Sequence, residues 1–182
     1  MDGLQDRNIL LCVCGGIAAY KSAVLVRRLA DAGARVQVAM TESATRFVTA
    51  QTFQALSGRS VRTSLWDEAA EAAMGHIELA RWPDQVLVAP ATANTLAKLA
   101  HGLADDLVST LCLATAAPLV VAPAMNRLMW AHPATQANMA LLGSRGVRIL
   151  GPAAGGQACG EVGEGRMLEP EEIVAALAGV GG

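Results

Sequence analysis

Short, continuous apolar runs alternate along the chain with longer segments in which apolar and polar residues recur at helical spacing. The apolar runs predict β-strands at residues 8–14, 35–40, 84–90, 118–126 and 146–152, with residues 61–66 as a further candidate. The segments between them predict helices at residues 18–33, 44–56, 92–101, 105–116, 133–144 and 170–179. Gly33 is expected to end the first of these helices, because glycine commonly follows the last helical turn.

Most of the predicted strands are apolar on both faces, and helices separate them along the chain. This pattern is typical of a parallel sheet covered by helices on both sides, so we predict an α/β fold. A chain of 182 residues is long enough for one domain with a substantial core. No repeat, low-complexity linker or internal boundary is visible, and we expect a single domain over residues 1–182.

The composition adds an expectation about the surface. Hydrophobic residues make up 53% of the chain, charged residues 16%, and the mean hydropathy is +0.36, which favours an oligomer. The net charge of −2 and the lack of a basic run argue against a nucleic-acid partner. Residues 107–126 carry no charge, but hydroxyl residues and prolines interrupt them, so we expect no membrane span. The N-terminus lacks the pattern of a signal peptide, which favours a cytoplasmic protein.

The four cysteines fall into two groups. Cys12, Cys14 and Cys112 lie in apolar segments and are expected to pack in the core. No Cys-x-x-Cys pair or histidine cluster indicates a metal site. Cys159 differs, because it lies in the segment GGQACGEVGEGRM at residues 155–167, which we interpret as too glycine-rich for a helix or a strand. A thiol in such a segment is poorly placed for burial and therefore suggests a function.

In parallel α/β sheets, ligands bind beyond the carboxyl ends of the strands, so the residues after each strand are the candidates for a site. Gly15 and Gly16 follow the first strand and predict either an anion site suited to phosphate or a plain tight turn. The third glycine of a dinucleotide fingerprint is missing. Thr41 and Ser43 follow the second strand, where their hydroxyls either bind a phosphate or cap the next helix.

Two further strand ends carry candidate residues. After the third long strand, the segment PATANT leaves open either a polar ligand contact or a helix cap by Thr92 or Asn94. After the fourth, Asn126 is placed to face the ligand crevice, whereas Met125, Met129 and Trp130 either line a pocket or join the core.

The histidines carry the next candidate chemistry. His76 is a candidate for proton transfer, because histidine titrates near neutral pH, or it is a satisfied structural residue. His101 fits a helix C-terminus and His132 a loop.

Five motifs, in this order along the chain, carry a resemblance to a known family: GGIAAYK, GHIELA, PATANT, PAMN and ACGEVGEGRM. The chain resembles the phosphopantothenoylcysteine decarboxylases, of the homo-oligomeric flavin-containing cysteine decarboxylase superfamily, from about Asn8 to Ala178. The resemblance implies a Rossmann-like (flavodoxin-like) fold, non-covalently bound FMN, and trimers that usually assemble into dodecamers. Glu164 is a departure from related sequences that we expect to be harmless.

The matching motif positions imply roles for individual residues. Implied FMN contacts are Gly15, Gly16, Ile17, Thr41, Ser43, Thr92, Ala93, Asn94, Thr95 and Ala124. Implied substrate contacts are Met125, Asn126, Met129, Ala158, Gly160, Arg166 and Met167, although a solvated charge is an equally good interpretation of Arg166. Implied catalytic residues are His76, as a base or a carboxylate contact, Asn126, which binds the substrate carboxylate, and Cys159, which donates a proton to an enethiol.

The implied reaction is the decarboxylation of 4'-phospho-N-pantothenoylcysteine to 4'-phosphopantetheine, a step towards coenzyme A, through thioaldehyde and enethiolate intermediates. A phosphopantothenate–cysteine ligase, fused or separate, is a possible partner. Three alternatives stay open: a peptidyl-cysteine decarboxylase, a flavin prenyltransferase, and a non-catalytic FMN-binding regulatory subunit. The last two do not require His76 or Cys159.

Overall fold

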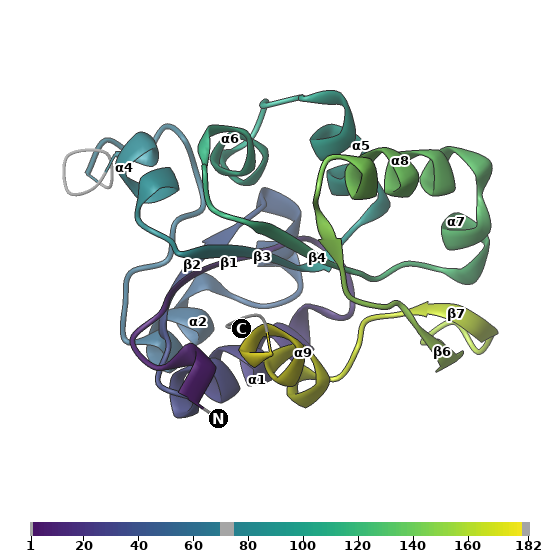
Figure 1. The fold of residues 1–182 in the computed structure, drawn as a ribbon, viewed down its shortest axis with the longest axis horizontal. Coiled ribbons are helices and arrows are strands. Elements are labelled where there is room, and N and C mark those ends of the chain that lie inside the picture. The colour runs from purple at the N-terminus through teal and green to yellow at the C-terminus, as the bar shows by residue number, and fades with distance from the viewer. Residues whose placement is uncertain (1, 70–74, 180–182) are drawn as a thin grey trace.

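The protein is built around a five-stranded parallel sheet (Figure 1). The computed structural model describes residues 2–69 and 75–179, so residues 1, 70–74 and 180–182 of the expected domain lie outside the described residues. The strands are β1 (Asn8–Val13), β2 (Arg35–Met40), β3 (Gln85–Ala91), β4 (Leu119–Pro123) and β5 (Arg148–Ile149). Their order is β2-β1-β3-β4-β5, which is the flavodoxin-like order. The predicted α/β class is therefore confirmed.

Helices cover both faces of the sheet, as Figure 1 shows. One layer contains α1 (Ala19–Asp31), α2 (Ala50–Ser57) and α9 (Pro170–Ala178), and the other contains α4 (His76–Arg81), α5 (Ala93–His101), α6 (Leu107–Ala114) and α8 (Pro133–Ser144). Successive side chains of a strand point to opposite faces. In β1, Ile9 and Leu11 therefore join the core under α1, whereas Leu10 and Cys12 join the core under α6.

The sixth candidate strand, at residues 61–66, is wrong. Only Arg62 pairs with β2, through a single parallel bridge to Ala39. Its backbone N–H donates to the Val38 carbonyl at 3.0 Å, and its carbonyl accepts from Met40 N–H at 2.8 Å. The chain then turns away, because the Ser64 hydroxyl accepts from the backbone N–H of Trp66. A local side-chain contact thus ends the pairing after one residue.

The predicted helix at residues 44–56 is divided in two. A 3-10 helix, η2 (Glu42–Arg46), comes first and α2 follows, because Thr41 caps the former and Thr49 the latter. A second short 3-10 helix, η1 (Asp2–Leu4), precedes β1. Gly33 follows α1 with φ +86°, in agreement with its expected place after the helix.

The glycine-rich segment around Cys159 contains strands, contrary to the expectation from its composition. Strands β6 (Ala153–Gly156) and β7 (Val162–Arg166) pair in antiparallel fashion and form a hairpin whose turn carries Cys159. Glycine is needed for close approach here: a Cβ at Gly165 would overlap the Met125 carbonyl oxygen, and Met125 N–H donates to Gly165 O at 2.9 Å. The glycines therefore let the hairpin dock closely against the chain after β4.

None of the helices within residues 2–69 and 75–179 combines the length and apolar character needed to cross a membrane.

Candidate functional site

The carboxyl edge of the sheet brings together the turns that follow β1, β2 and β3. After β1, the chain adds β2 on one side and then crosses to add β3 on the other side. The strand order therefore reverses between β1 and β3, and ligands bind at such a switch point. The turn at Gly15 and Gly16 leads from β1 into α1, and Thr92 leads from β3 into α5. The sequence prediction that these segments share one edge is in agreement with the topology.

The glycine turn lies directly against the segment after β2. A Cβ at Gly15 would lie 2.5 Å from Ser43 Oγ and 2.7 Å from the Ser43 carbonyl carbon, whereas a Cβ at Gly16 would meet nothing within 4 Å. A side chain at position 15 would therefore clash with Ser43, whereas position 16 faces open space. Ala18, the N-cap of α1, makes no side-chain cap, but the N–H groups of Ala19 and Lys21 already donate to the carbonyls of Gly16 and Ala18 at 2.9 and 3.0 Å. An anion at this edge would therefore depend on the glycine turn as well as on the helix start.

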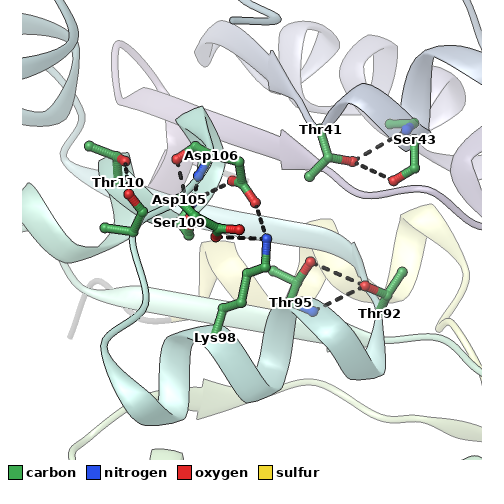
Figure 2. Close-up of polar contacts among 11 residues, drawn as sticks. Thr41, Ser43, Thr92, Thr95, Lys98, Asp105, Asp106, Ser109 and Thr110 are labelled. Atoms are coloured by element: carbon green, nitrogen blue, oxygen red, sulfur yellow. Dashed lines mark hydrogen bonds and ion pairs between the residues drawn. The ribbon is translucent and has the colours of Figure 1, made fainter. Parts of the chain in front are cut away.

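Two pairs of hydroxyls in this region, Thr41 with Ser43 and Thr92 with Thr95, combine a helix cap with a hydrogen-bonded partner, as Figure 2 shows. Thr41 Oγ1 accepts from Ala44 N–H at 3.2 Å and lies 3.2 Å from Ser43 Oγ. Thr92 Oγ1 accepts from Thr95 N–H at 3.2 Å, so Thr92 rather than Asn94 caps α5. Capping leaves further hydrogen-bonding capacity on each hydroxyl, and a ligand contact is compatible with it.

A charged cluster that the sequence interpretation missed borders the same edge (Figure 2). Lys98 Nζ lies 2.8 Å from Asp105 Oδ1 and 2.6 Å from Asp106 Oδ2. Asp106 also caps α6 through Ser109. Partial burial opposes ionisation of Asp106, but hydrogen bonds from Lys98 and from Ser109 N–H outweigh it and lower its pKa. The available signal was a pair of acidic residues immediately before an apolar helix.

A pocket of about 160 Å³ lies between this cluster and the end of β2. Thr41, Glu42, Asp105 and Asp106 supply its polar lining, and residues 63–66 form another wall. Trp66 in that wall is 87% exposed, which is unusual for so large an apolar side chain.

Asn126 and Cys159, which are 33 residues apart, meet at the start of α7 (Arg127–Ala131), a short helix that the periodicity did not predict. Asn126 Oδ1 accepts from Leu128 N–H at 2.8 Å and so caps α7. Its Nδ2 lies 3.6 Å from Cys159 Sγ and donates to Glu161 Oε2 at 2.6 Å. The Cys159 side chain is exposed in the hairpin turn. The amide is thus held rigidly, with its donor side turned towards the thiol.

Gln157, Glu161 and Glu164 dock the hairpin against α7. Gln157 Nε2 donates to the carbonyls of Met125 and Glu164, and Gln157 Oε1 accepts from the backbone N–H of Arg127 at 3.1 Å. Glu164 accepts from Trp130 Nε1 at 3.2 Å. The sequence interpretation had not assigned roles to Gln157 and Glu161, although polar residues on both sides of Cys159 were a usable signal.

His76 is not brought to this pair within one chain. It begins α4, which packs against α6, whereas α7 packs against β7. Figure 1 shows α4 and the hairpin at opposite ends of the molecule. One copy of the chain therefore places the three implied catalytic residues in two separate regions.

The remaining implied substrate contacts differ in their placement. Met129 is 49% exposed on α7, and Ala158 and Gly160 are exposed in the hairpin turn. Arg166 lies 3.1 Å from Glu169, a carboxylate that Lys21 also contacts at 2.7 Å. Met167 is 1% exposed and packs in the core under α1, so its side chain is buried away from solvent. Its methionine side chain completes the core, and its carbonyl accepts from Lys21 Nζ.

The implied FMN contacts also vary in accessibility. Ile17 is 63% exposed, Asn94 is exposed, and Ala93 and Ala124 are half-buried. Among the described residues, no group of three or more side chains is arranged to hold a metal ion.

The other cysteines are packed as expected. Cys12 and Cys14 are buried and Cys112 is half-buried. Burial raises the pKa of Cys14 to about 12, so this thiol stays protonated and unreactive at neutral pH. Cys159 is therefore the exposed thiol of the four.

Comparisons with known proteins agree with this arrangement. The family model described as Flavoprotein matches residues 2–181. The "Coenzyme A biosynthesis bifunctional protein CoaBC" of Vibrio vulnificus is 58% identical over 175 residues, which are 96% of this chain but 44% of that protein. The chain thus spans less than half the length of the curated relatives it matches.

Two solved structures share the fold. A phosphopantothenoylcysteine (PPC) decarboxylase mutant complexed with pantothenoylaminoethenethiol is 32% identical, with a TM-score of 0.83, covering 95% of this chain and 97% of the other. The FMN-dependent cysteine decarboxylase TvaF, from thioviridamide biosynthesis, is 33% identical, with a TM-score of 0.71, covering 80% of this chain and 90% of the other.

Proposed function

Because the chain belongs to the Flavoprotein family, we propose that it binds FMN and decarboxylates 4'-phospho-N-pantothenoylcysteine to 4'-phosphopantetheine. The observation that carries the proposal is the contact of Asn126 Nδ2 with the Cys159 thiol at the docked hairpin. This contact supports a site in which a carboxylate-binding donor lies beside a proton donor. The 58% identity to the coenzyme A biosynthesis protein supports this substrate over a peptide.

The donor set at the carboxyl edge fits FMN. The open turn at Gly16 before α1 and the hydroxyls of Thr41 and Ser43 suit a phosphate, and the close packing of Gly15 on Ser43 holds these groups together. Thr92 to Thr95, across the switch point, supply polar groups for the rest of the cofactor. When bound, FMN would supply reversible two-electron chemistry at the thiol-bearing carbon of the substrate, and the oxidised carbon would be an electron sink for loss of the adjacent carboxylate.

The chain's own residues bind, orient and protonate the substrate. Asn126 donates to the substrate carboxylate and holds the cysteine moiety, because its carbonyl oxygen is already engaged in capping α7. The hairpin covers the reacting atoms and excludes water. The Cys159 thiol then donates a proton to the carbon of the enethiolate as that group is reduced. A relative with a cysteine replaced by serine, in complex with an enethiol, supports this order of events.

We propose that the protein is a homo-oligomer, formed by trimers that assemble into a dodecamer. In each site, His76 of one copy lies beside Asn126 and Cys159 of another copy. The separation of α4 from the hairpin within one copy supports this, and so do the exposed apolar side chains Ile17, Tyr20 and Trp66. In such a site His76 acts as the base of the oxidative half-reaction or contacts the carboxylate.

Mixing two variants that each form little saturated product tests the shared site. Oligomers of His76→Asn and Cys159→Ser, dissociated and reassembled together, are expected to regain up to about a quarter of the wild-type product formation, because some interfaces then contain both native residues. Each variant reassembled alone is the control. If the mixture stays as inactive as its parents while mixed oligomers are verified by mass spectrometry, the two residues act within one copy.

We further propose that residues 1–182 act as the decarboxylase domain and that a phosphopantothenate–cysteine ligase, fused or separate, supplies the substrate in the cytoplasm. The bifunctional relatives support this partner, since the chain spans 44% of their length.

Turnover of two substrates tests the proposed activity. The purified protein is expected to be yellow and to release carbon dioxide from phosphopantothenoylcysteine at least about a hundredfold faster, in kcat/KM, than from a peptide ending in cysteine, since a site built for a polar group strongly rejects a ligand that lacks it. Preference for the peptide would support the peptidyl-cysteine alternative, to which the TvaF likeness lends weight. Bound flavin without release from either substrate would support a regulatory subunit.

A further inference from the structure

The carboxylate of Glu161 already occupies the amide that is proposed to bind the substrate carboxylate. Asn126 Nδ2 donates to Glu161 Oε2 at 2.6 Å, the shortest hydrogen bond of the hairpin–α7 contact. The Asn126 carbonyl oxygen is an acceptor, already used by Leu128 N–H, and offers nothing to a carboxylate. Only the NH₂ group can donate to a carboxylate, and its shorter contact is the one with Glu161.

Two other groups face this carboxylate. Arg127 NH2 lies 3.5 Å from Glu161 Oε1, and Cys159 Sγ lies 3.8 Å from Oε2. The Arg127–Glu161 pair is about 40% exposed on both sides, so solvent weakens it. Glu161 is therefore held chiefly by the amide, while Arg127 offers it an alternative partner at the surface.

A second carboxylate cannot share the amide with Glu161 without close repulsion between like charges. We propose that Glu161 is a positioning residue that occupies the carboxylate subsite of Asn126 in the unliganded protein and is exchanged for the carboxylate of the ligand. This rests on the proposed function for the identity of the ligand. On exchange, Glu161 moves towards Arg127, and the ligand carboxylate lies beside the Cys159 thiol.

The exchange gives the site a preference for ligands that carry a carboxylate. A neutral ligand has no group that competes with Glu161 for the amide. Once the carboxylate is lost as carbon dioxide, Glu161 returns to Asn126, and the return favours release of the decarboxylated product.

The reactivity of Cys159 towards two matched reagents tests the exchange. Iodoacetate carries a carboxylate next to its reactive carbon, whereas iodoacetamide is neutral, and both alkylate the same sulfur. The rates at Cys159 are measured by mass spectrometry on the full chain as purified. The nucleophilicity of the thiol affects both rates equally, so it does not change their ratio. In Glu161→Gln the iodoacetate-to-iodoacetamide ratio is expected to rise about tenfold, because a neutral acceptor holds the amide less strongly than a carboxylate.

A double-mutant cycle separates exchange from simple charge removal. Asn126→Ser removes the amide but keeps a side chain that caps α7. In that background Glu161→Gln is expected to change the ratio less than about twofold. Glu164→Gln, a control that removes a carboxylate of the same hairpin, is expected to leave the ratio within about twofold of wild type. An equal rise in both backgrounds, or no rise in either, overturns the proposal.

The outcome is independent of the proposed activity. A protein that shows the ratio change but releases no carbon dioxide from phosphopantothenoylcysteine has the exchange and lacks the proposed reaction. A protein that turns over this substrate without the ratio change has the reaction and lacks the exchange.

Discussion

Replacing Asn126 by aspartate is expected to lower decarboxylation of phosphopantothenoylcysteine about a thousandfold or more. The change keeps an oxygen that accepts from Leu128 N–H, so α7 retains its cap. It removes the NH₂ donor and puts a negative charge where the substrate carboxylate binds. The same charge faces Glu161, which lies 2.6 Å from the amide nitrogen in the wild type, and it therefore weakens hairpin docking.

The measurement is carbon dioxide release, together with the flavin spectrum and the melting temperature. Asn138→Asp is the matched control, because Asn138 lies on α8, where it contacts His101 rather than the hairpin. The control is expected to retain its activity. An Asn126→Asp protein with bound flavin and more than a tenth of the wild-type rate would show that the amide is not the carboxylate contact.

Replacing Cys159 by serine is expected to leave the oxidative decarboxylation within about tenfold of wild type and to lower formation of the saturated product about a hundredfold or more. A serine hydroxyl gives up its proton far less readily than a thiol, so the enethiol is released before it is reduced. The substitution is nearly isosteric and lies in an exposed turn. Cys159 Sγ lies 3.8 Å from Gln157 Oε1, but the hydrogen bonds from Gln157 Nε2 to Met125 and Glu164 do not involve it.

Mass spectrometry of the products distinguishes the enethiol from the saturated thiol by two mass units. Cys112→Ser is the control, since this thiol is half-buried on α6, away from the hairpin. Normal product at the normal rate from Cys159→Ser would show that another group delivers the proton.

The elements that were predicted correctly are those whose own pattern of apolar residues determines where they must be buried. The run at residues 84–90 became β3, which is buried along its whole length, because only a strand between two helical layers can cover apolar side chains on both faces. The prediction at residues 61–66 failed because strand pairing depends on a partner edge, and only Arg62 reaches one. The glycine-rich segment was misjudged for the same reason: β6 and β7 are stabilised by pairing and by docking on Met125, not by their own propensities.

The candidate site divides in a similar way. The residues after β1, β2 and β3 could be assigned to one edge, because parallel strands end together. The roles of Glu161 and Gln157 could not be assigned, because each depends on a contact with α7 across some thirty residues. Met167 lies in the motif, directly after β7, yet its side chain packs in the core, which depends on the fold around it.

The sequence alone determined the layered α/β architecture, the edge that gathers the candidate ligand contacts and the one cysteine outside the apolar segments, because apolar periodicity and motif order are local properties of the chain. Only the tertiary structure decided that Asn126 meets Cys159 under a docked hairpin, that His76 lies away from both, and that Glu161 already holds the amide. Those facts depend on which distant segments pack together, and packing is a property of the whole fold.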